Sequence, residues 1–161
     1  MLKSVVIYDS LYGNTEKIAR AIGDTLAEVG ESAILQVGDA KMDMLAAVKL
    51  IIVGSPTQGF KPTDAIQAFL KAIPDDQLKG VKVAAFDTRF TPSDIASTPV
   101  LPFMVKIFGY AAEPIAKALQ KKGGELPIAP EGFYVAGKEG PLVEGKLERA
   151  SAWARKLLTE A

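Results

Sequence analysis

Five short apolar segments of the chain are predicted to be β-strands. They occupy residues 4–8, 33–37, 50–53, 81–86 and 133–136. The first, third and fourth are apolar at nearly every position, without the alternation expected of a strand that has one face in water. Such continuity is typical of parallel strands that are covered on both faces.

Helical patterns alternate with these strands. The first begins near Asn14 or Thr15, and Gly30 is expected to end it; its stripe of apolar positions consists of Ile18, Ile22, Leu26 and Val29. Three more helices are predicted at about 62–73, 114–123 and 145–158. Their expected inward residues are Ile66, Phe69, Leu70 and Ile73, then Ile115 and Leu119, and finally Leu147, Ala150, Trp153, Ala154 and Leu157. A weaker helical turn is expected at 42–47.

The alternation of strands and helices predicts an α/β fold. Parallel strands need crossover connections, and helices supply them, so we expect a doubly wound, five-stranded parallel sheet with helices on both faces. The crossovers are expected to be right-handed. No change in composition divides the chain, and residues 1–161 are expected to form one domain.

One segment does not follow this alternation. Residues 90–108, between the fourth strand and the next predicted helix, are apolar and contain three prolines. A connection of this length without a regular pattern is usually a functional or mobile loop. We therefore predict a loop that covers a site, contacts a partner or mediates dimerisation.

The residue types that are absent from the chain limit the catalytic and metal sites it can form. The 161 residues include no histidine and no cysteine, and the 19 basic and 19 acidic residues give a formal net charge of zero. Serine–histidine triads, histidine or thiolate metal sites and protein-ligated iron–sulfur clusters are therefore excluded. The balanced charge argues against a nucleic acid partner, and no apolar run is long enough to cross a membrane or resembles a secretion signal. We expect a cytoplasmic protein that takes its chemistry from a bound cofactor.

A loop rich in hydroxyl groups joins the first strand to the first helix. Because a helix N-terminus presents unpaired N–H groups and a partial positive charge, such a loop is suited to bind an anion. Gly13 can adopt a backbone conformation that other residues resist. Asn14 or Thr15 capping the helix would explain the same residues equally well. The candidate anion-binding residues are Ser10, Leu11, Tyr12, Gly13, Asn14 and Thr15.

The sequence Tyr-Asp-Ser-Leu-Tyr-Gly-Asn-Thr-Glu-Lys-Ile-Ala at 8–19 resembles the FMN phosphate loop of the flavodoxin-like family, especially that of the flavodoxin modules of flavodiiron proteins. Ser10, Gly13, Asn14 and Thr15 match the usual form Thr/Ser-x-Thr-Gly-Asn-Thr. Tyr12 replaces the middle hydroxyl residue, so its backbone N–H is expected to serve there. The resemblance implies FMN as the cofactor and a flavodoxin-like sheet with the strand order 2-1-3-4-5.

The resemblance also implies that the loops after the third and fourth strands flank the flavin ring. Gly-Ser-Pro-Thr at 54–57 is similar to a family segment whose polar groups bond the edge of the flavin. Gln58 stands where the family often has an aromatic residue, so either Gln58 or Phe60 takes that place. Gly59 matches a glycine whose peptide turns toward the reduced flavin in some flavodoxins. The candidate residues of this loop are Ser55, Pro56, Thr57, Gln58, Gly59 and Phe60.

Asp-Thr-Arg-Phe at 87–90 is similar to the family's Asp-Ser-Ser-Tyr segment and adds Asp87, Thr88, Arg89 and Phe90 to the candidate site. Phe90 falls where a tyrosine often stacks on the ring, although the core is an alternative place for it. Arg89 departs from the family pattern and leaves two interpretations open. It is either a cation near the flavin that favours the reduced, anionic form and raises the reduction potential, or a surface arginine paired with Asp87 or Asp94.

Three functions are compatible with these residues. The first is an FMN-binding electron carrier that docks transiently on redox partner proteins, with the apolar residues 98–105 in place of the acidic face typical of flavodoxins. The second is an FMN-dependent NAD(P)H:quinone oxidoreductase, and the third is a binding module without flavin. A flavodiiron enzyme is excluded for this chain because it has no histidine to bind the metals. The oligomeric state stays open.

Overall fold

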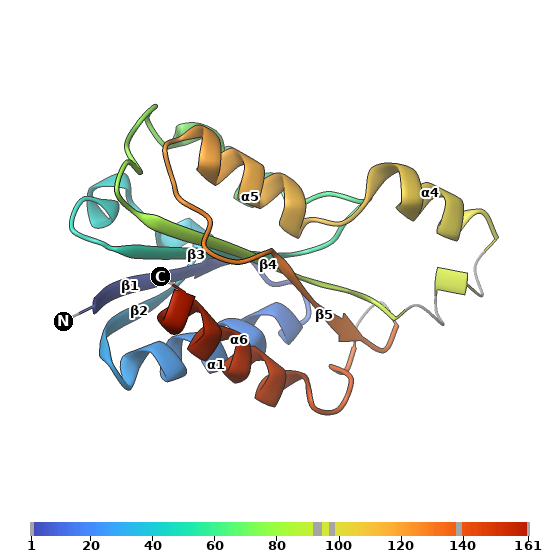
Figure 1. Ribbon diagram of the computed structural model, residues 1–161. Coiled ribbons are helices and arrows are strands. Elements are labelled where there is room, and N and C mark those ends of the chain that lie inside the picture. Colours follow the sequence, from blue (N-terminus) through green and yellow to red (C-terminus); the bar gives the residue numbers. More distant parts are fainter. Residues whose placement is uncertain (1, 92–94, 97–98, 138–139, 161) are drawn as a thin grey trace.

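The computed structural model describes residues 2–91, 95–96, 99–137 and 140–160. Five strands alternate with helices along the chain (Figure 1). The strands are β1 (Leu2–Tyr8), β2 (Gly30–Gln36), β3 (Leu50–Pro56), β4 (Lys82–Phe90) and β5 (Glu131–Val135). The α-helices are α1 (Asn14–Ala27), α2 (Asp64–Ala72), α4 (Leu101–Phe108), α5 (Ala112–Lys121) and α6 (Lys146–Glu160), and two short 3-10 helices are η1 (Val37–Asp39) and η2 (Met42–Leu45).

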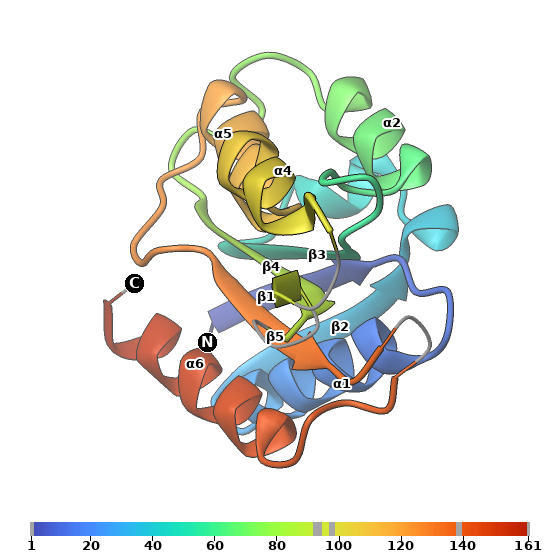
Figure 2. The same cartoon turned by 90° about the vertical axis from the view of Figure 1, so that its right-hand side faces the viewer.

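The strands form one parallel sheet in the order β2-β1-β3-β4-β5. Figure 1 shows α1 and α6 on one face of this sheet and α5 on the other, and Figure 2 shows α2 beside α5. The predicted doubly wound α/β fold, its strand order and the helices on both faces are confirmed. Within the described residues, no helix has the length and apolar character needed to cross a membrane.

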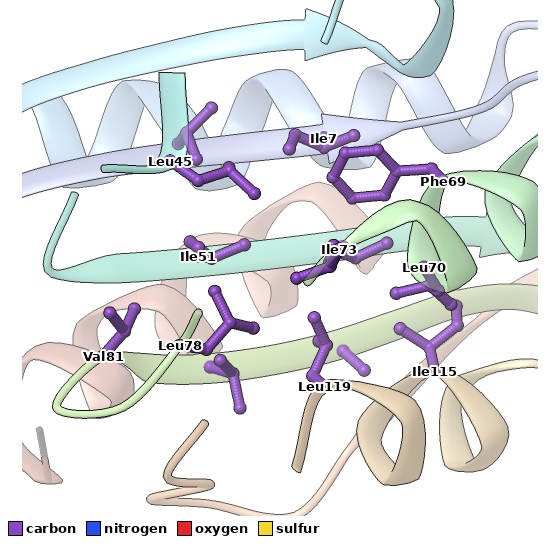
Figure 3. Close-up of a cluster of buried hydrophobic side chains, with 14 of the residues drawn as sticks. Ile7, Leu45, Ile51, Phe69, Leu70, Ile73, Leu78, Val81, Ile115 and Leu119 are labelled. Atoms are coloured by element: carbon purple, nitrogen blue, oxygen red, sulfur yellow. The ribbon is translucent and has the colours of Figure 1, made fainter. Parts of the chain in front are cut away.

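The continuous apolar strands bury side chains on both faces, as their sequence predicts. In β3, Ile51 and Val53 belong to the core on one face, while Leu50 and Ile52 belong to the core on the other. The first core packs β1, β3 and β4 against α2 and α5, and its central side chains are drawn in Figure 3. Each fully buried leucine, isoleucine or valine contributes roughly 1.5–3 kcal/mol to folding through its removal from water.

Three aromatic rings form the centre of the second core, beneath α1 and α6. Phe86, Phe133 and Trp153 meet edge to face with ring centroids 6.1–6.3 Å apart. Gly54 of β3 makes room for the Phe86 ring, because a Cβ atom at residue 54 would collide with it. The prediction that Trp153 lies in the core is confirmed.

The prediction of a loop over residues 90–108 is wrong at its second half. Residues 101–108 form α4, with Pro102 in the first helical turn, where its missing N–H group breaks no helical bond. The segment lacks the polar positions that mark one face of an amphipathic helix, and this is why its periodicity gave no signal. None of the described α4 side chains belongs to either core.

Smaller corrections concern the ends of elements. The first helix ends at Ala27, so Val29 is exposed instead of packed, and β2 begins at Gly30 because that residue already pairs with Leu2 of β1. Leu147, predicted to face inward, is 43% exposed at the start of α6. The helical turn expected at 42–47 is the 3-10 helix η2.

Candidate functional site

A pocket of about 330 Å³ lies at the carboxyl ends of β1, β3 and β4. Figure 2 looks onto this end of the sheet, with α4 and α5 on one side and α1 on the other. All the residues predicted for the site line the pocket except Gly13, Ser55 and Asp87. The residues that line it are Ser10, Leu11, Tyr12, Asn14, Thr15, Pro56, Thr57, Gln58, Gly59, Phe60, Thr88, Arg89, Phe90, Ile95, Leu101, Val105, Tyr110 and Val135.

The loop between β1 and α1 is held in shape by its own side chains. The Ser10 Oγ accepts hydrogen bonds from the backbone N–H groups of Gly13, at 3.1 Å, and Glu16, at 3.3 Å. Gly13 has a φ of 90° and is the N-cap residue of α1, so the chain enters the helix through a left-handed turn. The N-cap makes no side-chain hydrogen bond, and the alternative that Asn14 or Thr15 caps this helix is therefore wrong.

Asn14 and Thr15 are the first residues of α1 and point inward. Their exposed fractions are 7% and 2%, and both line the pocket. The Thr15 Oγ1 lies 2.9 Å from the Thr88 Oγ1 of β4, in a buried hydrogen bond. The Asn14 side chain lies against the backbone of Gly140, where a Cβ atom would collide with it. Hydroxyl and amide groups thus gather at the N-terminus of α1, which carries a partial positive charge.

The loop after β3 makes a tight turn at the pocket wall. Gln58 and Lys61 exchange two backbone hydrogen bonds, at 2.8 and 3.1 Å, and the two residues between them, Gly59 and Phe60, have φ values of 53° and 68°. A left-handed conformation is uncommon for phenylalanine and costs free energy. Ser55 lies behind the wall, fully buried, where its Oγ accepts the N–H of Thr63 at 3.0 Å.

The last four residues of β4 have two different positions relative to the pocket. Thr88, Arg89 and Phe90 line the pocket, whereas Asp87 is fully buried behind it. The Asp87 carboxylate accepts two hydrogen bonds from Arg89, each 2.7 Å long, and one from the N–H of Ala112, at 2.9 Å. Burial raises the pKa of the Asp87 carboxyl above its usual value, and the hydrogen bonds from Arg89 and Ala112 oppose that rise.

Of the two interpretations of Arg89, its pairing with Asp87 is confirmed, although most of the guanidinium is buried instead of lying on the surface. Asp94, the other partner considered, lies outside the described residues. The expected effect of Arg89 on the reduction potential stays a prediction. Phe90 is 38% exposed and lines the pocket, so its assignment to the core is wrong.

Five residues of the pocket were not among the individual candidate residues, although the segment 90–108, which contains three of them, was predicted as a loop that could cover a site. They are Ile95, Leu101, Val105, Tyr110 and Val135. The position of Val135 as the last residue of β5 was a usable signal, because ligands of such sheets bind at the carboxyl ends of strands. For Leu101 and Val105 the signal was the apolar segment 90–108, which was expected to cover a site, contact a partner or mediate dimerisation, and the structure places both residues in the pocket wall together with Tyr110.

The pocket has a polar end and an apolar end. The polar end combines a helix N-terminus with the side chains of Ser10, Asn14 and Thr15, which suits a phosphate group. The apolar end has aromatic and aliphatic walls, which suit a planar ring system. The described residues contain no group of three or more acidic residues that could hold a metal ion. Both ends therefore fit a ligand with a phosphate at one end and an aromatic ring system at the other, as in FMN.

Comparisons with known proteins agree with this geometry. The sequence profile of the flavodoxin family matches residues 6–153. The chain is 28% identical over 134 residues to probable flavodoxin 1 of Bacillus subtilis, and the match covers 81% of each chain. Oxidised flavodoxin 1 of Bacillus cereus has a similar structure, with a TM-score of 0.76, 19% identity and coverage of 99% of both chains. Rubredoxin oxygen:oxidoreductase of Desulfovibrio gigas matches 98% of this chain with 36% of its own length, at a TM-score of 0.70 and 20% identity.

Proposed function

The chain belongs to the flavodoxin family, and from this we propose that it carries electrons between redox partner proteins through an FMN held in the pocket described above. Members of this family bind FMN, and FMN is the cofactor of this chain. Bound FMN supplies electron-transfer chemistry, and the residues of the chain bind the cofactor, orient it and limit the access of water.

The observation that carries the proposal is the match between the two ends of the pocket and the two ends of FMN. We assign the phosphate to the N-terminus of α1, with Ser10, Asn14 and Thr15 as side-chain ligands and the neighbouring backbone N–H groups as further donors. We assign the ring system to the apolar end, between the loops that follow β3 and β4. The chain has no histidine or cysteine, so proton transfer to a second substrate would require a carboxylate, a lysine or a tyrosine.

Purification and spectroscopy test this function. The protein is expected to show the absorption bands of bound flavin, or to acquire them when FMN is added, and to undergo reversible reduction. A reductase that accepts NADPH should pass electrons through it to cytochrome c, while the chain alone oxidises NADPH slowly in the presence of a quinone. Rapid NADPH:quinone turnover by the chain alone would identify an oxidoreductase instead. A colourless protein that does not bind added FMN would contradict both functions.

Partner proteins are proposed to dock at the mouth of the pocket through apolar contacts. Leu11, Tyr12 and Phe90 line the pocket and are 38–49% exposed, and Val100 and Phe103, at the start of α4, are 75% and 65% exposed. Electron transfer requires the partner to approach the cofactor. Leu11, Tyr12 and Phe90 lie at the pocket itself, and Val100 and Phe103 belong to the segment that contributes Leu101 and Val105 to its wall. With a net charge of zero, the chain has little long-range attraction for a charged partner.

This mode of docking predicts a weak dependence on salt. The rate of electron transfer between the loaded protein and its reductase should change little with ionic strength, whereas docking through a charged face would slow steeply as salt is added. Phe103→Glu should slow the transfer, and Val29→Glu, at another exposed apolar residue next to the amino end of β2, should not. Equal rates for both variants would show that the partner docks elsewhere.

A further inference from the structure

The guanidinium group of Arg89 is fixed on three sides. Its Nε and Nη2 groups donate to the two carboxylate oxygens of the buried Asp87, each at 2.7 Å. Beneath it lies Gly132 of the neighbouring strand β5, where a Cβ atom would collide with the guanidinium group. Above it lies the ring of Tyr110, with the central guanidinium carbon 3.7 Å from the ring centroid. Arg89 is thus a flat, immobile layer between a glycine and an aromatic ring.

The backbone next to Tyr110 is held just as firmly. Tyr110 lies between α4 and α5, and the N–H groups of the next two residues are bound by one side chain from the loop after β3 and one from β4. The N–H of Ala111 donates to the Thr57 Oγ1 at 3.1 Å, and that of Ala112 donates to the Asp87 Oδ2 at 2.9 Å. The N-cap residue Ala111 makes no side-chain hydrogen bond, and Thr57 and Asp87 satisfy two of the N–H groups that have no partner within the helix at the start of α5.

Tyr110 lines the apolar end of the pocket, Arg89 also reaches the pocket, and the three residues pack one against the next in the order Gly132, Arg89, Tyr110. We propose that Tyr110 is the aromatic residue against which the ring system of FMN packs, in the place left open by Gln58, and that Arg89 is a positioning residue that holds the tyrosine ring for this contact. The inference rests on the proposed function and assigns a role in it to two residues of this chain.

The physical reason is preorganisation. An aromatic side chain that is free to rotate loses that freedom when a ligand packs against it, and this loss weakens binding. Arg89 restrains Tyr110 through a cation–π contact that involves only the protein and is of a kind that is stronger when partly desolvated. Phe90, the aromatic candidate on β4, is 38% exposed and is the last residue of its strand.

The test measures the binding of FMN and of riboflavin, which has the ring but lacks the phosphate, to the apoprotein. Tyr110→Leu should weaken the binding of both ligands by a similar factor, roughly tenfold. Tyr110→Phe should restore most of the lost affinity, but the bound flavin should fluoresce more brightly. A phenol donates an electron to an excited flavin and quenches its emission, whereas a phenyl ring does not. Tyr134→Phe, at a tyrosine of β5 that does not line the pocket, is the matched control and should change neither quantity.

Arg89→Lys tests the positioning role. This variant keeps the positive charge but loses the flat surface under the ring and the paired hydrogen bonds to Asp87. It should lower the affinity for both ligands and raise the emission of the bound flavin, as expected when the tyrosine ring is no longer held. Gly132→Ala, which displaces the guanidinium group from below, should have the same effect with the charge and all donors intact. Denaturation of each apoprotein shows whether a variant is folded under the conditions of the titration.

The outcomes separate the inference from the function. If the wild-type protein binds FMN while both Tyr110 variants keep its affinity and its emission, Tyr110 is not the stacking residue and the proposed function stands. If the Tyr110 variants behave as expected but Arg89→Lys and Gly132→Ala do not, Arg89 does not position the ring. If the wild-type protein binds neither ligand, the proposed function itself is wrong.

Discussion

The two ends of the pocket are built in different ways. The polar end comes from one continuous stretch, residues 10–15, whose shape depends on a left-handed glycine and on hydrogen bonds to Ser10 within the loop. The apolar end is assembled from residues far apart in the chain, among them Phe60, Phe90, Leu101 and Val135. The shape of the polar end therefore depends on residues within one short stretch, whereas the shape of the apolar end depends on the packing of the whole fold.

The difference makes the two ends separable by experiment. Riboflavin contains the ring system of FMN but no phosphate, so it reports on the apolar end alone. A variant that damages the polar end should weaken the binding of FMN and spare that of riboflavin. A variant that damages the apolar end should weaken the binding of both ligands by the same factor.

The largest effect is expected from Gly13→Val. Residue 13 has a φ of 90° with open space around it, so the variant suffers conformational strain without a collision. The strain should cost about 2 kcal/mol and, by displacing the N-terminus of α1, should lower the affinity for FMN roughly thirtyfold while riboflavin binding is retained. Isothermal titration with both ligands measures this.

Gly80→Val is the matched control for Gly13→Val. Residue 80 has a φ of 79° and open space around it, but it precedes β4 at the opposite end of the sheet from the pocket. The variant should lose a similar free energy of unfolding and keep its affinity for FMN. Equal losses of affinity in the two variants would mean that general destabilisation, and not the phosphate loop, controls binding.

A smaller effect is expected from Phe90→Ala at the apolar end. The side chain lines the pocket and lies outside both cores, so its removal should reduce the affinities for FMN and riboflavin together, by roughly fivefold, with little change in the unfolding free energy of the apoprotein. Leu147→Ala, at an exposed apolar residue of α6 outside the pocket, should leave both affinities unchanged. A loss confined to FMN would contradict the assignment of the ring to this end.

The smallest effect is expected from Thr57→Val, which breaks a long-range support of the apolar end. The variant leaves the N–H of Ala111 without the hydroxyl that accepts it and should reduce the unfolding free energy by about 1 kcal/mol. Thr25→Val is the control, because the Thr25 hydroxyl only donates to the carbonyl of Ala21 one turn earlier in its own helix. Chemical denaturation compares the two, and an equal loss in both would show that the Thr57 hydrogen bond contributes nothing specific.

Much of the fold could be read from the chain. The apolar runs of β1, β3 and β4 determined that a parallel sheet is covered on both faces, because only a strand buried on both sides is apolar at successive positions. The shape of the loop at residues 10–15 also depends on local interactions, since Gly13 and Ser10 act on their immediate neighbours. These features depend on interactions between residues that are close in sequence or on a repeating pattern.

Other features were decided only by the tertiary structure. Asp87 carries no mark in the sequence that separates it from Thr88, yet it is buried behind the pocket, where it binds Arg89 and the N-terminus of α5. Tyr110 reaches the pocket because Thr57, directly after β3, and Asp87 of β4 bind the backbone next to it. Interactions between residues this far apart are specified by the packing of elements against each other. The sequence by itself therefore determined the sheet and the shape of the loop at residues 10–15, and the folded chain decided which side chains line the pocket and which ones hold them there.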